Sequence, residues 1–147
     1  MWVAAISSCG LVTGGTGSMV SRMMGGGRTA SGSGSPGFVS GTVATPRVVR
    51  IVAGPGDRFN PSDVSIHAGE TITFEVTTMG PTVHEFKLGP LDAVKADAAD
   101  LPEIASIGMM QSGSLTYTFD GVGPFGFACH EPGHFEAGMW GTISIVS

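Results

Sequence analysis

Apolar and polar residues alternate in several short segments between residue 47 and the end of the chain. The clearest segment is 71–77, where Ile72, Phe74 and Val76 fall on one face, as in a half-buried strand. The predicted strands are 48–52, 71–77, 84–88, 114–119 and 142–146, and an apolar run at 122–127 leads into Cys129. Gly and Pro residues between these segments supply turns. The pattern is typical of an all-β domain.

Residues 91–99 interrupt the strand pattern with a sequence rich in Ala, Asp and Lys. Leu91, Val94 and Ala98 share one side of a helix at this spacing, so we expect a short helical insert here. Short strands, Gly/Pro turns and one small insert together predict a Greek-key β-sandwich. A domain of about a hundred residues can bury a core without disulfide bonds.

The first 45 residues differ from the rest of the chain. They are rich in Gly and Ser and contain no acidic residue, which predicts a flexible tail at 1–45 ahead of a folded domain at 46–147. The tail carries Arg22 and Arg28, so five of the seven Lys and Arg residues and all twelve acidic residues lie in the domain, giving it a net charge of −7. This charge argues against nucleic acid as a partner. We expect a monomer.

Three donor side chains stand at even spacing near the C-terminus: Cys129, His134 and Met139. A thiolate, an imidazole and a weak thioether are the ligands that a mononuclear blue-copper centre takes from one loop, and His84 can supply the second imidazole. This set suits both Cu(I) and Cu(II), because soft sulfur favours the first ion and imidazole serves both. The spacing therefore predicts one copper ion per chain, with Cys129 bound as thiolate and Met139 as the axial ligand.

Other roles fit these residues less well. Zinc binds Cys and His, but a thioether is a poor zinc ligand. The binuclear copper site of respiratory oxidases needs two bridging cysteines, and a c-type haem attachment needs Cys-x-x-Cys-His; the segment around Cys129 has neither. Taken singly, a Cys, a His or a Met is most often an ordinary core or surface residue. Their coincidence at this spacing favours a metal site.

From Phe59 to the C-terminus the chain resembles the plastocyanin/azurin-type cupredoxins, the small blue-copper proteins. The resemblance rests on residues 59–61, 64–66, 68–74, 84–86, 129–139 and 141–145. The loop 129–139 is the specific part, since the strand patterns alone would fit many β-sandwiches. The resemblance implies a cupredoxin-like fold and places His84, Cys129, His134 and Met139 on the family's four copper ligands.

Two positions next to these ligands raise questions. Many cupredoxins have Asn after the first His, where it braces the loop that carries the Cys, but this chain has Glu85. Either another group supports the thiolate, or the site is looser. His130 directly follows Cys129, as in proteins where a Cys-His pair links a blue site to a second copper. We expect His130 to be a solvent-facing loop residue, because the rest of a second site is missing from the sequence pattern.

The amino terminus carries a possible export signal. Residues 6–10 resemble a bacterial lipobox, in which Cys9 would become the lipidated first residue of the mature protein, but the apolar stretch before it is too short for a complete signal peptide. Either Met1 is internal to a longer precursor, which we favour, or the match is chance. Contact with a membrane is expected only through this anchor. Met19 and its neighbours Met23 and Met24 could bind Cu(I) weakly, although incidental residues are the simpler interpretation.

Three functions are compatible with these features. The leading hypothesis is a non-enzymatic, extracytoplasmic carrier of single electrons between partner redox proteins. The alternative is a copper-binding or copper-tolerance protein that exchanges the metal with copper donors and acceptors. The third is a reductase or oxidase domain that uses His130 for a second copper, and the missing ligands argue against it.

Overall fold

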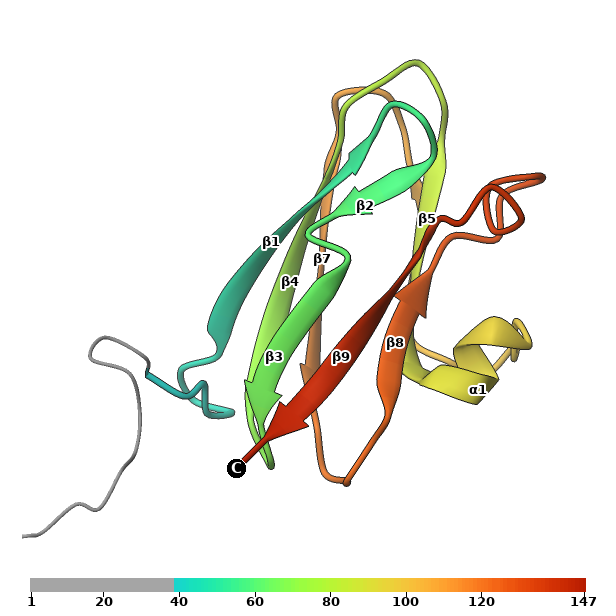
Figure 1. Ribbon diagram of the computed structural model, residues 1–147. Coiled ribbons are helices and arrows are strands. Elements are labelled where there is room, and N and C mark those ends of the chain that lie inside the picture. Colours follow the sequence, from blue (N-terminus) through green and yellow to red (C-terminus); the bar gives the residue numbers. More distant parts are fainter. Residues whose placement is uncertain (1–38) are drawn as a thin grey trace, which may run out of the picture. The chain divides into compact units, whose positions relative to one another are not determined.

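The computed structural model describes residues 39–147, which form two facing β-sheets (Figure 1). The first sheet has the order β2-β1-β4-β7: β1 is Arg47–Gly54, β2 is Arg58–Asn60, β4 is Thr71–Thr78 and β7 is Ser112–Thr118. The second has the order β3-β9-β8-β5-β6: β3 is Asp63–His67, β5 is His84–Pro90, β6 is Glu103–Ile107, β8 is Phe125–Ala128 and β9 is Trp140–Val146. The predicted all-β sandwich is confirmed. Cys9 and the three tail methionines lie outside the described residues.

Strand β4 lies inside the first sheet, between a parallel neighbour, β1, and an antiparallel one, β7. Its alternating apolar residues Ile72, Phe74 and Val76 are fully buried, as predicted. Hydroxyl groups face each other along the β4–β7 pair; Thr73 and Thr116, for example, are hydrogen-bonded at 2.8 Å. One face of β4 therefore builds the core while the other stays polar.

Five phenylalanine rings from both sheets form the centre of the core. Phe86 and Phe127 stack with their centroids 5.2 Å apart, and Phe59 meets both edge-on at 5.7 and 5.3 Å. Phe74 and Phe119 extend this group. Cys129 and Met139 belong to the same buried cluster. Two of the predicted metal ligands thus rest on closely packed aromatic side chains.

Strands β2, β3 and β6 were not predicted from the sequence. Strand β3 is short, although Val64 and Ile66 are buried at alternate positions, whereas β2 and β6 bury very little. Strand β2 has three residues, of which only Phe59 is buried. Strand β6 has five residues, only Ile107 is buried, and it lies at the edge of its sheet. Neither segment shows the regular alternation that marks a half-buried strand.

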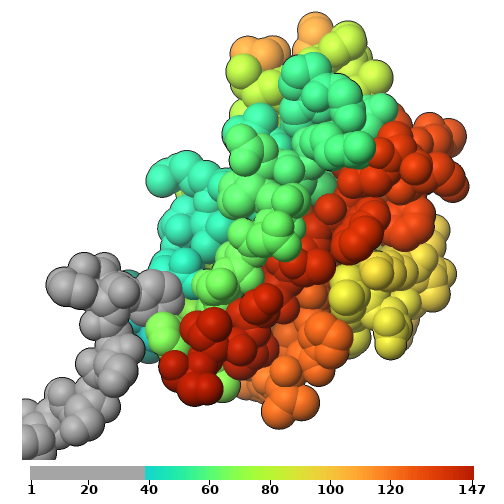
Figure 2. Space-filling model, in the orientation of Figure 1, coloured from blue at the N-terminus to red at the C-terminus, as the bar shows by residue number. Residues whose placement is uncertain are grey.

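The helical insert is confirmed as α1, Leu91–Lys95, which is shorter than the range 91–99 predicted for it. It packs against β5 and β8, and its residue Val94 is fully buried. Figure 2 shows this segment, in yellow, beside the C-terminal strand and its preceding loop, in red, and Lys95 lies 4.3 Å over the ring of Trp140. No helix in residues 39–147 is long and apolar enough to cross a membrane.

Residues ahead of Pro46 also contact the sandwich. The buried carboxylate of Glu70 accepts hydrogen bonds from the backbone N–H groups of Gly41 and His67, both at 2.9 Å, and from Arg47 Nε at 2.6 Å. Burial alone would raise the pKa of Glu70, but these donors outweigh it and lower the pKa below its ordinary value of 4.5. Glu70 thereby ties segment 39–45 to the domain.

Candidate metal centre

The loop between β8 and β9, residues 129–139, is held in shape by its own backbone. Cys129 N–H donates to the carbonyl of Met139 at 3.0 Å, which joins the two ends of the loop. The middle is fixed in the same way, since His134 N–H donates to the carbonyl of Glu131 at 2.9 Å and Met139 N–H donates to that of His134 at 3.0 Å. The order of the predicted ligands along the chain thus becomes a fixed arrangement in space.

A contact with β2 holds the outer side of this loop. Arg58 donates a hydrogen bond from Nη1 to the carbonyl of Ala137. Gly138 follows with φ 98°, a conformation that side chains rarely adopt, and a Cβ there would lie 2.7 Å from Arg58 Nη1. Glycine is favoured here chiefly by this backbone conformation, because the guanidinium is the far end of a flexible side chain and can move aside.

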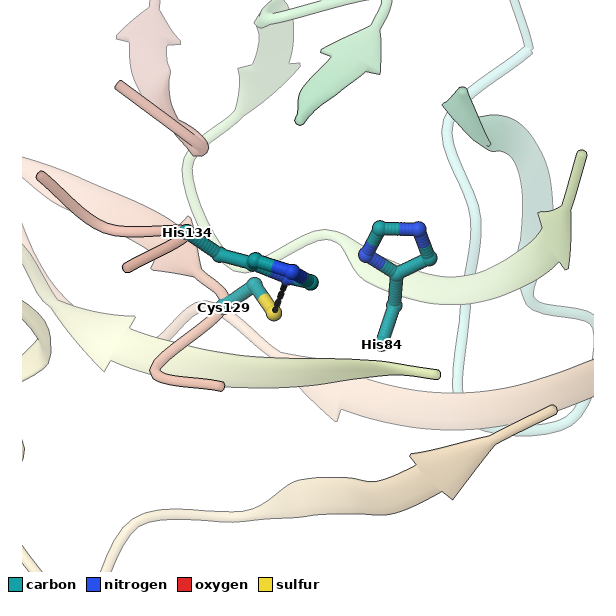
Figure 3. A group of neighbouring side chains, drawn as sticks. All are labelled: His84, Cys129 and His134. Atoms are coloured by element: carbon teal, nitrogen blue, oxygen red, sulfur yellow. Dashed lines mark hydrogen bonds between the residues drawn. The ribbon is translucent and has the colours of Figure 1, made fainter. Parts of the chain in front are cut away.

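Three of the predicted ligands converge at this end of the sandwich, as Figure 3 shows. One donor atom from each of His84, Cys129 and His134 lies within 4.8 Å of the others. Cys129 Sγ is 3.4 Å from His134 Nδ1, and the rings of the two histidines are 4.9 Å apart. Cys129 and His84 are fully buried, and the His134 side chain is 12 % exposed. We call these three residues the inner group.

Both imidazoles of the inner group have a polar neighbour at their far nitrogen, although within the described part of the chain only that of His84 makes a hydrogen bond there. His84 Nε2 is hydrogen-bonded to Thr82 Oγ1 at 3.1 Å, and His134 Nε2 lies 3.5 Å from Asp57 Oδ1. His84 Nδ1 is buried and has no hydrogen-bond partner among residues 39–147. A buried nitrogen without a partner is unfavourable unless it binds something else. This nitrogen fits a metal ion, and polar partners on the opposite nitrogens are typical of metal-binding histidines.

The protonation of the inner group also suits a metal. Burial lowers the pKa of His84 below its ordinary value of 6.5, and the nearby His134 lowers it further. The imidazole is therefore neutral, as a metal ligand must be. Burial raises the pKa of the Cys129 thiol above 9.0, although backbone N–H groups of Glu85 and Glu131 partly oppose this effect. Cys129 thus holds its proton until a metal ion displaces it.

Comparison with known proteins identifies the metal. Residues 50–146 match a protein family described as copper binding proteins, plastocyanin/azurin family. The chain belongs to this family. Its cofactor is copper, and the inner group offers the sulfur and nitrogen donors that copper prefers. The resemblance inferred from the sequence is confirmed.

Two curated relatives share the name copper-resistant cuproprotein CopI. The protein from Rubrivivax gelatinosus is 35 % identical over 109 residues, which cover 67 % of this chain and 66 % of that protein. The protein from Pseudomonas aeruginosa is 25 % identical over 126 residues, which cover 59 % of this chain and 70 % of that protein. The chain therefore spans about two thirds of the length of each relative.

Solved structures of cupredoxins share the fold. Auracyanin from the photosynthetic bacterium Roseiflexus castenholzii matches with a TM-score of 0.60 at 21 % identity, over 68 % of this chain and 97 % of that one. An azurin from Methylomonas sp. strain J matches with a TM-score of 0.56 at 17 % identity, over 69 % and 98 %. This cupredoxin therefore shares the sandwich fold of these proteins.

The last predicted ligand of this cupredoxin, Met139, is fully buried at the far end of the loop. It belongs to the same core cluster as Cys129, and the backbone of Cys129 is bonded to its carbonyl. Its role as the axial copper ligand stays a prediction.

The structure shows how this cupredoxin supports the thiolate without the usual Asn. The backbone N–H of Glu85 lies 3.3 Å from Cys129 Sγ and donates to it. The Glu85 side chain takes a different direction, toward Lys87 at 3.7 Å. The backbone, and not the side chain, of position 85 therefore contacts the sulfur.

The expectation of a solvent-facing His130 is wrong. Its side chain is 12 % exposed and stacks on Phe135, with centroids 4.9 Å apart and planes at 16°. One donor atom from each of Glu85, Asp97 and His130 lies within 4.8 Å of the others. We call these three residues the outer group. No local pattern in the sequence marks it, because Asp97 is brought in by α1, far from the other two along the chain.

Proposed function

We propose that His84, Cys129, His134 and Met139 hold one copper ion as a type 1 centre, and that the protein carries single electrons outside the cytoplasm. The supporting observation is the convergence of a buried thiol and two imidazoles, one of which has a buried nitrogen without a partner. Bound copper supplies a one-electron couple between Cu(I) and Cu(II).

The surrounding residues favour this use because they limit movement of the donors. The aromatic core fixes Cys129, and the hydrogen bond from Glu85 N–H stabilises its thiolate form. Thr82 orients the His84 imidazole by a hydrogen bond, and Asp57 lies beside the far nitrogen of His134. Ligands held in this way need to rearrange little between two oxidation states, which is the requirement for rapid electron exchange.

The proposed setting is the periplasm or cell envelope, with Cys9 as a lipid anchor and no enzymatic activity. The membership of the family and the copper-resistance names of the relatives support an extracytoplasmic role. The acidic domain suits a redox partner with a basic docking surface.

The test is a titration of the metal-free, full-length chain with Cu(II), followed by visible absorption and electron spin resonance. We expect an intense thiolate-to-copper band at one equivalent, with narrow copper hyperfine splitting. Voltammetry of the loaded protein should then show a reversible one-electron wave. A pale complex, or preference for zinc, would contradict the ligand assignment.

Copper tolerance is the second candidate function, because both curated relatives are named for copper resistance. A protein that delivers copper should pass Cu(I) to an apo-acceptor faster than it exchanges electrons with small redox agents. The full burial of Cys129 and Met139 favours the electron carrier, since a ligand without exposed surface is hard for an acceptor to reach. Measuring both rates on the same sample separates the two functions.

A further inference from the structure

The outer group lies immediately behind the inner group. Glu85 follows His84 in β5, and His130 follows Cys129 after β8, so each of these outer residues is the chain neighbour of an inner one. Successive side chains of an extended chain point to opposite faces of a sheet. His84 and Cys129 are buried on the core side, whereas Glu85 and His130 face the side covered by α1, from whose C-terminal end Asp97 joins them.

Carboxylates outnumber cations in the outer group and the two residues beside it, Lys87 and Glu103. Lys87, whose side chain is 8 % exposed, donates a hydrogen bond to Asp97 and lies 3.3 Å from Glu103 and 3.7 Å from Glu85. One ammonium thus faces three carboxylates. Partly buried charges are unfavourable unless they are compensated. The cluster can therefore accept a further cation.

His130 gives this cluster a ligand whose ring nitrogens make no hydrogen bond to the described residues. Both of its ring nitrogens are buried without a hydrogen-bond partner, and so is Glu85 Oε1. His130 Nδ1 lies 3.5 Å from Asp97 Oδ1 and 3.7 Å from Glu85 Oε1. These distances are too long for good hydrogen bonds. Two ligands about 2.0–2.2 Å from a tetrahedral ion are themselves about 3.3–3.6 Å apart, which is close to the spacing seen here.

We propose that Glu85, Asp97 and His130 form a second metal site, which binds a divalent transition-metal ion through nitrogen and oxygen, such as Zn²⁺ or Cu²⁺. An imidazole with two carboxylates suits ions of this class, whereas Cu(I) prefers sulfur. Lys87 neutralises the carboxylates when the ion is absent. This site goes beyond the proposed electron transfer and does not depend on it.

The first test uses full-length protein whose copper centre is loaded and reduced, so that Zn²⁺ meets a filled inner group. Calorimetry and metal analysis should show one additional Zn²⁺ per chain. Asp97→Asn should weaken this binding at least tenfold, because it removes a ligand and a charge; Asn also tolerates the φ of 53° at this position. Glu103→Gln is the matched control. It removes the same charge from beside the same lysine but no ligand, and should change the affinity by less than about threefold.

The second variant predicts a gain. Lys87→Met keeps the length of the side chain and removes the competing ammonium, so Zn²⁺ should bind about tenfold more tightly. Misfolding cannot produce this result. Absence of the additional Zn²⁺, equal loss in Asp97→Asn and Glu103→Gln, or binding that is unchanged in Asp97→Asn would each overturn the proposal.

A titration with Cu²⁺ beyond the first equivalent shows which ions the site accepts. Copper in the outer group should give a second spin-resonance signal with ordinary hyperfine splitting and no thiolate band, and Asp97→Asn should lack it. Uptake of Zn²⁺ alone, Cu²⁺ alone or both supports the site and defines its selectivity. Uptake of neither overturns it.

Discussion

The inner and outer groups contain neighbouring residues of the chain but differ in their donor atoms and in the charge around them. The inner group combines a thiol with two imidazoles above an apolar, aromatic core. The outer group combines one imidazole with carboxylates around a buried lysine. The peptide units between His84 and Glu85, and between Cys129 and His130, lead from one group to the other. Because successive side chains point to opposite faces, His84 and Cys129 contribute to the inner group while the next residues, Glu85 and His130, contribute to the outer group.

The comparison shows how burial affects the charge states of the two groups. A charged group is costly to place in the core, so Cys129 and His84 are neutral without metal: the pKa of Cys129 is raised and that of His84 is lowered, both chiefly by burial. In the outer group burial also raises the pKa of Glu85, but the neighbouring Lys87 opposes this effect. The hydrogen bond from Lys87 lowers the pKa of Asp97 and keeps it ionised.

The largest effect should come from Cys129→Ser, which breaks the inner group alone. A hydroxyl cannot replace the soft thiolate, so the intense copper band should disappear completely. Binding of Zn²⁺ to the outer group should persist. Met139→Gln is the matched comparison: copper should stay bound with a changed reduction potential, measured by voltammetry. An unchanged spectrum in Cys129→Ser would show that the sulfur is not a ligand.

Phe86→Ala tests how far the inner group depends on the aromatic core. Phe86 is fully buried and contacts three other rings, so its truncation should cost about 3–5 kcal/mol of unfolding free energy. Urea denaturation of the metal-free protein measures this loss. Val122→Ala is the control, because Val122 is 94 % exposed and its truncation should be nearly neutral. Similar losses in both variants would argue against a core at Phe86.

Val94→Ala should have a smaller effect on stability and should act on the outer group. The fully buried Val94 holds α1 against β5 and β8, and its truncation should cost about 1–2 kcal/mol. The looser helix should weaken Zn²⁺ binding, because Asp97 follows α1, while the thiolate band stays unchanged. Loss of the thiolate band with intact Zn²⁺ binding would contradict this prediction, because it would show that Val94 supports the inner group and not the outer group.

The smallest effect is the pH dependence contributed by His84. Its pKa in the metal-free folded protein lies below the ordinary value of 6.5, whereas the unfolded chain titrates near that value. The unfolded state then binds more protons as the pH falls below 6.5, so stability should decline with falling pH through this window. Nuclear magnetic resonance of the His84 ring should give a midpoint below 6.5. A midpoint above that value would contradict the burial argument.

The sequence predicts the parts of this molecule that have short-range patterns. Alternation located β4, and the spacing of Cys129 and His134 located the loop. The outer group has no such pattern, because Asp97 reaches it only after α1 folds back on β5 and β8. Strands β2 and β6 were missed since they contribute one buried residue each, and β3 was missed because its alternation extends over only five residues. The position of Glu85 was recognised as unusual, but its backbone contact with sulfur depends on the pairing of two distant segments.

The loop 129–139 also has a consequence for protein engineering. Its first and last residues are joined by the bond from Cys129 N–H to the Met139 carbonyl, and its internal turns are bonded within the loop. The loop between β8 and β9 is therefore closed at its base by a backbone hydrogen bond. We therefore expect that a loop of different length can be inserted here without moving the strands, provided that this closing bond and the hydrogen bond from Arg58 to the Ala137 carbonyl are kept.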